Sequence, residues 1–247
     1  MPHFFINSNS IENNSISIKD EELLNHLVKS LRLKEGERLL LFDENKIRYE
    51  TKIKSVSKKE ITTEIEKKYP SQRFIDYEIY LAPSIIKQDG FNELISGVTQ
   101  LGIKGLYPLY TDNTAVSKSQ IENKTQKWQK ISDESVKQCE RADFMKIFET
   151  STLQNFDYSM FDKIIVFSEI EEKNTIKSIS PSIKKTDRIL VITGTEGGFS
   201  SKEFDFFKEK NFCQVKISNL ILKAQTACIS GISNLIYELS EWKTTKI

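Results

Sequence analysis

The sequence predicts a mixed α/β protein of two domains, a small β-barrel followed by an α/β domain with a mainly parallel sheet. Two observations support this. Before residues 69–73, strand-like runs surround one helical stretch, whereas after them buried strand-like runs alternate with stretches of helical length. The segment between reads Tyr69-Pro70-Ser71-Gln72-Arg73, which is typical of a linker. We therefore expect domains over residues 1–70 and 74–247.

The composition limits the class of protein. With 247 residues, of which 38% are hydrophobic and 29% charged, the chain is expected to be globular rather than disordered. Lys and Arg total 36 against 35 Asp and Glu, so the chain has no global positive field. A nucleic-acid partner would therefore be bound by local basic patches.

Cysteine and histidine usage excludes several further classes. Three cysteines without a C-x-x-C pair suggest a reducing, cytoplasmic setting, and we expect them to be small core residues. No apolar run approaches the roughly 18 residues of a membrane span. With two histidines, a zinc site or a His-dependent triad has little to be built from, and no metal is expected. His26 is interpreted as a partly buried ring.

The first domain is expected to hold one helix among strands. Asp20 is suited to the N-cap, an apolar stripe runs from Leu23 to Leu31, and Gly36 is expected to end the helix. Residues 47–53 alternate apolar and polar side chains as a half-buried strand does, with Arg48 on the polar side. The other expected strands are Phe4–Ile6, Ile16–Ile18, Leu39–Phe42 and Ile61–Ile65.

The second domain is expected to be built from strands and helices in alternation. A helix with an apolar stripe from Phe91 to Leu101 should stop at Gly102, and a last helix should bury Cys228 to Leu239. A polar helix over 124–141 lies between them. The expected strands are Ile79–Ala82, Leu106–Leu109, Ile164–Phe167, Ile189–Thr193 and Gln214–Ile217.

The most informative stretch is a buried strand that runs into a glycine-rich turn and a helix. It reads Thr193-Gly194-Thr195-Glu196-Gly197-Gly198-Phe199-Ser200, and Ser200 with Glu203 fits a capping box. The glycines would permit positive φ and close approach of a ligand at the carboxyl end of a strand. A ligand-binding loop and a tight turn without a ligand both remain open, because the spacing matches no standard phosphate-binding motif.

A second stretch, Ile217 to Ala227, joins the last strand to the last helix. Leu220, Ile221 and Leu222 are unusual in a connector, because connectors are normally polar. They indicate a segment packed either in a corner of the core or as the wall of an adenine pocket.

Together the two stretches resemble the RsmE family of 16S ribosomal RNA uridine N3 methyltransferases, members of the SPOUT superfamily. In that family the first loop reads close to I-G-P-E-G-G-F-S and the second close to L-G-x-R-I-L-R-x-E-T-A. Met1-Pro2-His3-Phe4-Phe5 and His26-Leu27-Val28-Lys29-Ser30-Leu31-Arg32 extend the match. This chain departs from the family at Thr195, Ser218, Leu220, Lys223 and Gln225.

The resemblance implies a PUA-like β-barrel for RNA and a SPOUT α/β domain with a deep trefoil knot. It also implies a cytoplasmic homodimer that uses S-adenosylmethionine, without a metal, on 16S ribosomal RNA or the small ribosomal subunit. The two stretches and the segment 167–169 would wrap the cofactor. The implied cofactor-binding residues are Ile192, Thr193, Gly194, Glu196, Gly197, Gly198, Ile217, Ser218, Leu220, Leu222 and Thr226.

Methylation at N3 of uracil requires loss of the imide proton, so a positive charge and a proton acceptor are expected nearby. Lys223 could stabilise the anionic base, and Gln225 keeps an acceptor where the family has glutamate. Glu196 is the nearest carboxylate, although it could instead cap a helix or tether a backbone amide.

Three basic residues are candidates for RNA contact. Lys29 and Arg32 lie one turn apart on the first helix and could bind phosphates, or they could form a solvated polar face. Arg141 ends the polar helix, where it could interact with the helix C-terminus or reach RNA from the partner subunit. Two other functions remain open: a SPOUT methyltransferase with another RNA target, and a non-catalytic RNA-binding homologue.

Overall fold

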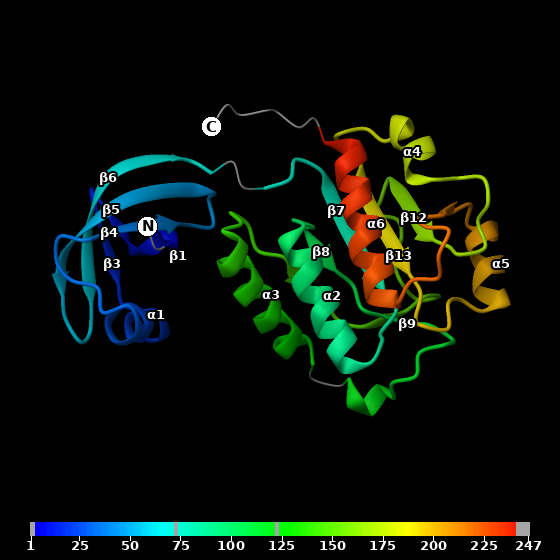
Figure 1. Ribbon diagram of the computed structural model, residues 1–247, viewed down its shortest axis with the longest axis horizontal. Helices are drawn as coiled ribbons and strands as arrows, with labels where there is room; N and C mark the ends of the chain where they lie inside the picture. The colour runs from blue at the N-terminus through cyan, green and yellow to red at the C-terminus, as the bar shows by residue number, and fades with distance from the viewer. Residues whose placement is uncertain (1–2, 72–73, 122–123, 241–247) are drawn as a thin grey trace. The chain divides into compact units, whose positions relative to one another are not determined.

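The computed structural model describes residues 3–71, 74–121 and 124–240 (Figure 1). The chain forms two compact units. One comprises Met1–Phe74 together with Val136–Phe144, and the other comprises Ile75–Ser135 together with Met145–Ile247.

The first unit is a six-stranded sheet with strand order β1-β4-β5-β6-β3-β2. Strand β1 is parallel to β4, and the other neighbours are antiparallel. Ile16, Leu39, Leu41 and Ile53 are buried in its core beside Leu27. The strands are β1 (His3–Phe5), β2 (Ile11–Glu12), β3 (Ser15–Ile18), β4 (Arg38–Phe42), β5 (Ile47–Val56) and β6 (Ile61–Pro70), with a 3-10 turn at Ser8–Ser10.

The helix of this unit begins as predicted and ends earlier than predicted. The Asp20 carboxylate accepts a hydrogen bond from the Leu23 N–H at 2.8 Å, which caps α1 (Glu21–Asn25), and a π-helical turn continues over His26–Ser30. Arg32 then takes a left-handed φ of 54°, so the prediction that Gly36 ends the helix is wrong. Gly36, with φ 89°, lies in the turn before β4 instead.

Two expectations about side-chain exposure in this unit are also corrected. Arg48 is only 6% exposed, because its guanidinium donates to the Glu140 carbonyl at 2.8 Å and to the Ser71 hydroxyl at 3.1 Å. Alternation along β5 could not reveal these partners, which lie far away in sequence. His26 is exposed rather than partly buried, and its ring meets Phe4 edge-on.

The second unit is built on a six-stranded sheet with strand order β10-β8-β7-β13-β12-β14. All its neighbouring strands pair in parallel, which confirms the predicted α/β arrangement. The strands are β7 (Glu78–Pro83), β8 (Gly105–Leu106), β10 (Lys146–Ile147), β12 (Lys163–Phe167), β13 (Arg188–Thr193) and β14 (Cys213–Val215). A separate parallel pair joins β9 (Leu109–Tyr110) and β11 (Ser151–Thr152).

Helices cover both faces of this sheet (Figure 1). Strand β13 shows why, because Ile189 and Val191 point into one buried cluster whereas Leu190 and Ile192 point into another. The first cluster includes residues of α2 (Gln88–Gln100), α3 (Thr125–Cys139) and α6 (Ala224–Leu239). The second includes Phe204 and Phe207 of α5 (Ser201–Glu209). The short α4 (Ile176–Ile179) contacts α6, and 3-10 turns occur at Lys118–Gln120 and Ser180–Ser182.

The predicted helix signals in this unit are confirmed. Gly102 follows α2 with φ 93°, and Cys228, Ile232 and Leu235 of α6 are fully buried. Cys139 and Cys213 are only partly buried, so Cys228 is the only one of the three cysteines that is fully buried in the core. Within the described ranges, no helix has the length and apolar character that a membrane span requires.

Candidate functional site

A cavity of about 310 Å³ lies where β12, β13 and β14 end, at the carboxyl edge of the sheet. In parallel α/β sheets this edge is where ligands bind. Three segments form the walls of this glycine-loop pocket, together with the first turn of α6. Its lining residues are Phe167, Ser168, Glu169, Thr193, Gly194, Thr195, Glu196, Gly197, Gly198, Ile217, Ser218, Leu220, Ile221, Leu222, Ala224 and Ala227.

The glycine loop, residues 193–198, is closed by hydrogen bonds. The Thr195 hydroxyl accepts from the Gly197 N–H at 3.2 Å, and the Gly198 N–H donates to the Thr195 carbonyl at 3.0 Å. The Asn113 amide donates to the carbonyls of Gly197 and Gly198 at 3.0 and 3.2 Å. Thr195, where the resembling family has proline, thus helps to hold the turn.

Of the three glycines in the loop, only Gly198 has a positive φ, at 65°. Gly194 and Gly197, which would also permit a positive φ, do not adopt one. Gly194 has another reason to lack a side chain, since a Cβ there would lie 3.2 Å from the backbone of Gly198. A Cβ on Gly198 would collide with the Glu169 carboxylate, so glycine at 198 lets Glu169 reach across the loop.

The predicted capping box of α5 is confirmed and has a further partner. Ser200 N–H donates to the Glu203 carboxylate at 2.8 Å, and Glu203 N–H donates to the Ser200 hydroxyl at 3.2 Å. The second carboxylate oxygen of Glu203 accepts a hydrogen bond from the Asp112 N–H at 2.9 Å. Glu203 is only 1% exposed, so these bonds satisfy a buried carboxylate. These bonds anchor the C-terminal end of the glycine loop to residues 112–113.

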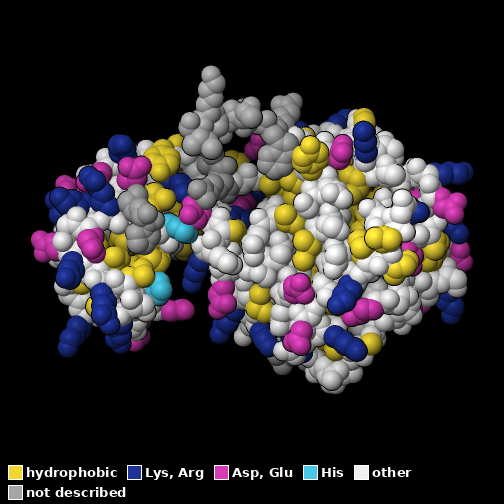
Figure 2. All heavy atoms as spheres, viewed as in Figure 1, with side chains coloured by type: hydrophobic (Ala, Val, Ile, Leu, Met, Phe, Trp, Pro, Cys, Tyr) yellow, Lys and Arg dark blue, Asp and Glu magenta, His cyan; other side chains and the backbone are white. Residues whose placement is uncertain are grey.

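The connector, residues 216–223, forms the opposite wall. Leu220 and Ile221 are 75% and 89% exposed, so the alternative of a corner in the core is wrong and the pocket-wall alternative is supported. Figure 2 shows hydrophobic side chains at the surface over α6 and the segment that precedes it. Exposed Leu and Ile beside a cavity provide an apolar surface for a ligand.

The third wall is the segment that follows β12. Ser168 is 3% exposed, and its hydroxyl oxygen has no hydrogen-bond partner among the described residues. Buried hydroxyls normally have a partner, so a polar atom of a bound molecule would satisfy this one. The pocket thus offers a ligand a polar side at Ser168 and Glu169 and an apolar side at the connector.

Most of the predicted cofactor-binding residues line the pocket, and two do not. Ile192 is fully buried in β13, where its side chain packs toward α5. Thr226 is exposed on α6 outside the lining. The prediction missed Thr195, Ile221, Ala224 and Ala227; the spacing of the two alanines on the first turn of α6 is the signal that could have found them.

Of the three predicted catalytic residues, only Glu196 lines the pocket, where it is exposed. Lys223 is exposed at the N-cap of α6, next to the lining residue Ala224. The Gln225 amide oxygen lies near α2, 3.5 Å from where a Cβ on Gly90 would be.

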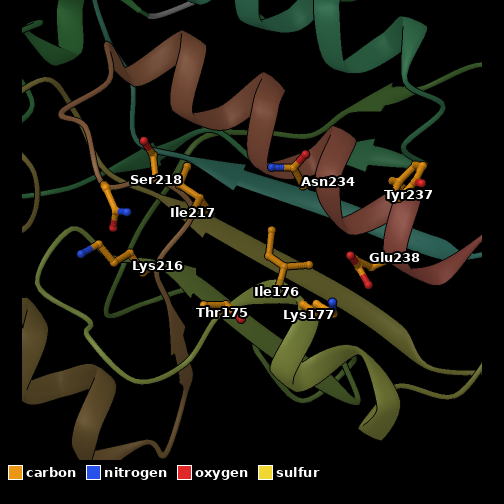
Figure 3. Close-up of a pocket in the computed structure, with 10 residues that line it drawn as sticks. Thr175, Ile176, Lys177, Lys216, Ile217, Ser218, Asn234, Tyr237 and Glu238 are labelled. Carbon is orange, nitrogen blue, oxygen red and sulfur yellow. The ribbon is translucent and has the colours of Figure 1, made fainter.

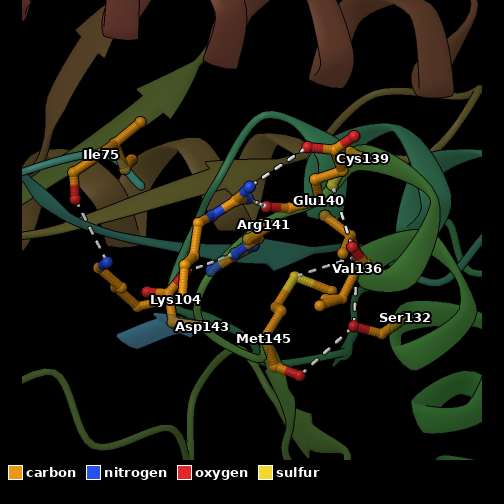
Figure 4. Close-up of polar contacts among 11 residues, drawn as sticks. Ile75, Lys104, Ser132, Val136, Cys139, Glu140, Arg141, Asp143 and Met145 are labelled. Carbon is orange, nitrogen blue, oxygen red and sulfur yellow. Dashed lines mark hydrogen bonds and ion pairs between the residues drawn. The ribbon is translucent and has the colours of Figure 1, made fainter. Parts of the chain in front are cut away.

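The three predicted RNA-contacting residues differ in exposure. Lys29 and Arg32 are exposed in the first unit, and Figure 2 shows many other Lys and Arg side chains on it. Arg141 is only 3% exposed, and its Nε lies 2.7 Å from the Asp143 carboxylate (Figure 4). Such a buried pair supports the structural alternative for Arg141.

The described residues contain no cluster of His, Cys, Asp and Glu side chains placed to hold a metal ion. Burial raises the pKa of the Cys228 thiol to about 12, against a smaller opposing effect of a hydrogen bond with Thr193. This thiol is therefore protonated at neutral pH and is unsuited to act as a nucleophile.

Known proteins resemble nearly the whole chain. Ribosomal RNA small subunit methyltransferase E of Rickettsia conorii is 29% identical over 233 residues, covering 94% of this chain and 93% of that protein. Ribosomal RNA small subunit methyltransferase E 2 of Borreliella burgdorferi is also 29% identical, covering 94% of this chain and 96% of the relative. Similar solved structures include a ribosomal RNA small subunit methyltransferase E from Neisseria gonorrhoeae bound to S-adenosyl methionine. It has a TM-score of 0.78 at 20% identity and covers 95% of this chain and 96% of the other.

Two protein families match separate parts of the sequence. Residues 18–66 match the RNA methyltransferase PUA domain. Residues 75–236, which include every residue that lines the glycine-loop pocket, match the RNA methyltransferase domain. The chain therefore belongs to the RNA methyltransferase family, and it carries the PUA domain of such enzymes in front of the methyltransferase domain.

Proposed function

We propose that this protein transfers a methyl group from S-adenosylmethionine to N3 of one uridine in 16S ribosomal RNA. The glycine-loop pocket carries the proposal, because it lies inside the matched methyltransferase domain and combines an apolar wall with the unsatisfied hydroxyl of Ser168. The names of the relatives support ribosomal RNA of the small subunit as the substrate.

The pocket residues suit this cofactor. The apolar side chains of Leu220, Ile221 and Leu222 would pack against the adenine, and the Ser168 hydroxyl would bond to a polar group of the cofactor. Gly194, Gly197 and Gly198 leave the loop backbone open to close approach. When bound, S-adenosylmethionine supplies an electrophilic methyl group. The chain's own contribution is to orient the donor and the base and to exclude water.

Proton removal from the uracil imide is the step for which the chain must supply charge. Lys223 follows the apolar part of the connector, and its ammonium would stabilise the base as it becomes anionic. Glu196 lines the pocket and is the proposed proton acceptor among the three residues predicted to be catalytic. Gln225 lies near Gly90 of α2, so we assign it a positioning role at the start of α6.

The finer architecture belongs to the same proposal. Domains over 1–70 and 74–247 would be a PUA-like β-barrel and a SPOUT domain with a deep trefoil knot, acting in the cytoplasm as a homodimer. The exposed Leu220 and Ile221 suit a wall that a partner subunit or the cofactor covers. Lys29 and Arg32 would contact RNA phosphates, whereas the buried Arg141 would have a structural role through its ion pair with Asp143.

Two measurements test the proposal. In calorimetric titration, S-adenosylmethionine should bind to the purified protein, and a non-catalytic homologue with a degenerate pocket should not bind it. Reverse-transcription mapping should then find one 16S uridine that loses its N3-methyl group when the gene is deleted. A methyl group lost from another RNA would favour a methyltransferase with a different target, and no lost methyl group would contradict methylation.

A further inference from the structure

A second cavity, of about 330 Å³, adjoins the glycine-loop pocket. This α4–α6 pocket lies between the start of α4 and the exposed side of α6 (Figure 3). Ile217 and Ser218 of the connector line both cavities. A molecule in the second pocket would therefore be separated from the first only by the connector.

The side chains of the α4–α6 pocket combine a flat ring, an apolar floor and an amide. Tyr237 of α6 is 65% exposed, and Ile176 at the start of α4 is 5% exposed. Figure 3 shows Asn234 on α6 above Ile176, with Ile217 and Ser218 at one end. A ring of this kind can stack on a base, and an amide can both donate to and accept from the edge of a base.

Two lysines lie at opposite ends of this pocket. Lys216 is at the end formed by the connector, and Lys177 is at the other end beside Glu238 (Figure 3). Thr175 and Lys216 belong to paired backbone segments, so the connector end is held by the edge of the sheet. Lysines at both ends suit a ligand that carries a phosphate on each side of its base, as a nucleotide within a strand does.

We propose that the α4–α6 pocket binds one unpaired nucleotide of the RNA substrate, close in sequence to the nucleotide that is methylated. The inference rests on the proposed function for the identity of the RNA. The volume of the α4–α6 pocket is at the lower end of the range of ligand sites, about 300–1,000 Å³, and this size suits a single nucleotide. An enzyme that modifies a base must hold it out of the stack, and a stacking site for a neighbour stabilises that arrangement.

The test measures affinity for 16S ribosomal RNA transcribed in vitro, by filter binding at fixed salt concentration. Tyr237→Ala should weaken binding about tenfold, whereas Tyr237→Phe, which keeps the ring, should stay within about twofold of the wild type. Lys216→Ala should reduce the slope of log binding constant against log salt concentration by about one, because one fewer counterion is released. Lys202→Ala on α5 is the matched control and should leave this slope unchanged. RNA carrying 4-thiouridine should crosslink to the α6 peptide that contains Tyr237.

Other outcomes would overturn the inference. The inference is wrong if Tyr237→Ala binds RNA as tightly as the wild type, or if 4-thiouridine crosslinks only to peptides outside α6. Light scattering shows whether Tyr237→Ala changes the oligomeric state. If it does, and RNA affinity is lost with it, this face is a contact between subunits and the inference fails. Failure of the proposed function would look different, because the wild type would then bind no S-adenosylmethionine or methylate no 16S uridine.

Discussion

The two main walls of the glycine-loop pocket are built in opposite ways. In the glycine loop, side chains and backbone hold one another, with Thr195, Asn113 and the Ser200–Glu203 box closing the turn. The connector instead exposes Leu220 and Ile221, and Ser218 accepts one local hydrogen bond from the Leu220 N–H. One wall is therefore preformed, and the other has apolar surface that a bound molecule or a partner would cover.

This difference indicates how the two walls would contribute to binding. The preformed wall costs little conformational entropy when a ligand arrives, whereas the connector gains free energy by removing Leu and Ile from water. Substitutions in the loop should therefore act through backbone geometry, and substitutions in the connector through buried apolar area.

The largest effect is expected from Gly198→Val. A β-branched residue is strained at φ 65°, and its side chain would collide with Glu169. We expect affinity for S-adenosylmethionine to fall at least about 100-fold in calorimetric titration. Gly36→Val is the control for backbone strain alone, because Gly36 also has a positive φ, at 89°, but lies outside the pocket. Equal losses in the two variants would contradict the backbone argument.

Lys223→Ala should have the next largest effect, on rate rather than on affinity. Loss of a charge that stabilises the anionic base should slow single-turnover methylation about 100-fold, with S-adenosylmethionine affinity nearly unchanged. Lys223→Arg should keep much of the rate. If the alanine variant keeps its turnover and has a lower melting temperature, Lys223 is a structural charge and takes no part in methyl transfer.

Connector substitutions should produce an intermediate effect. Leu220→Ser should weaken S-adenosylmethionine binding at least about tenfold, because burying a leucine side chain contributes about 1.5–3 kcal/mol and about 1.4 kcal/mol corresponds to a factor of ten. Its melting temperature should stay at the wild-type value, since Leu220 is 75% exposed in the free chain. A large fall in melting temperature would show instead that Leu220 packs against a partner subunit or within the fold.

The smallest effect is expected from Asn113→Ala. It removes two hydrogen bonds to the carbonyls of Gly197 and Gly198, each contributing about 0.5–1.5 kcal/mol at most to the order of the loop. We expect a loss of about threefold in S-adenosylmethionine affinity and faster amide exchange in residues 194–198. Asn155→Ala, an exposed position outside the pocket, is the control. An effect as large as that of Gly198→Val would mean that the hydrogen bonds of Thr195 and the Ser200–Glu203 box do not hold the loop without Asn113.

The same contrast marks how far the sequence could predict the structure. The parallel strands and the Ser200–Glu203 box depend on local periodicity and spacing, and they are present as expected, except that the predicted strand Leu106–Leu109 is broken into β8 and β9. The connector is unusual already in the sequence, because connecting loops are normally polar and this one contains three consecutive apolar residues. The alternation in β5 misplaces Arg48, because its partner Glu140 is 92 residues away and no periodicity in β5 carries that information. For Gln225, sequence spacing could not tell that its amide lies near α2 rather than in the pocket.

The central claim is tested most directly by reconstituting the reaction on one defined substrate. Small ribosomal subunits or 16S RNA from a strain that lacks the gene would be incubated with the purified protein and S-adenosylmethionine carrying an isotopically labelled methyl group. Digestion and nucleoside mass spectrometry would then locate the label. The account predicts close to one labelled N3-methyluridine per 16S molecule with the wild type and almost none with Gly198→Val. Label in a different nucleoside, or no label while the protein still binds S-adenosylmethionine, would contradict it.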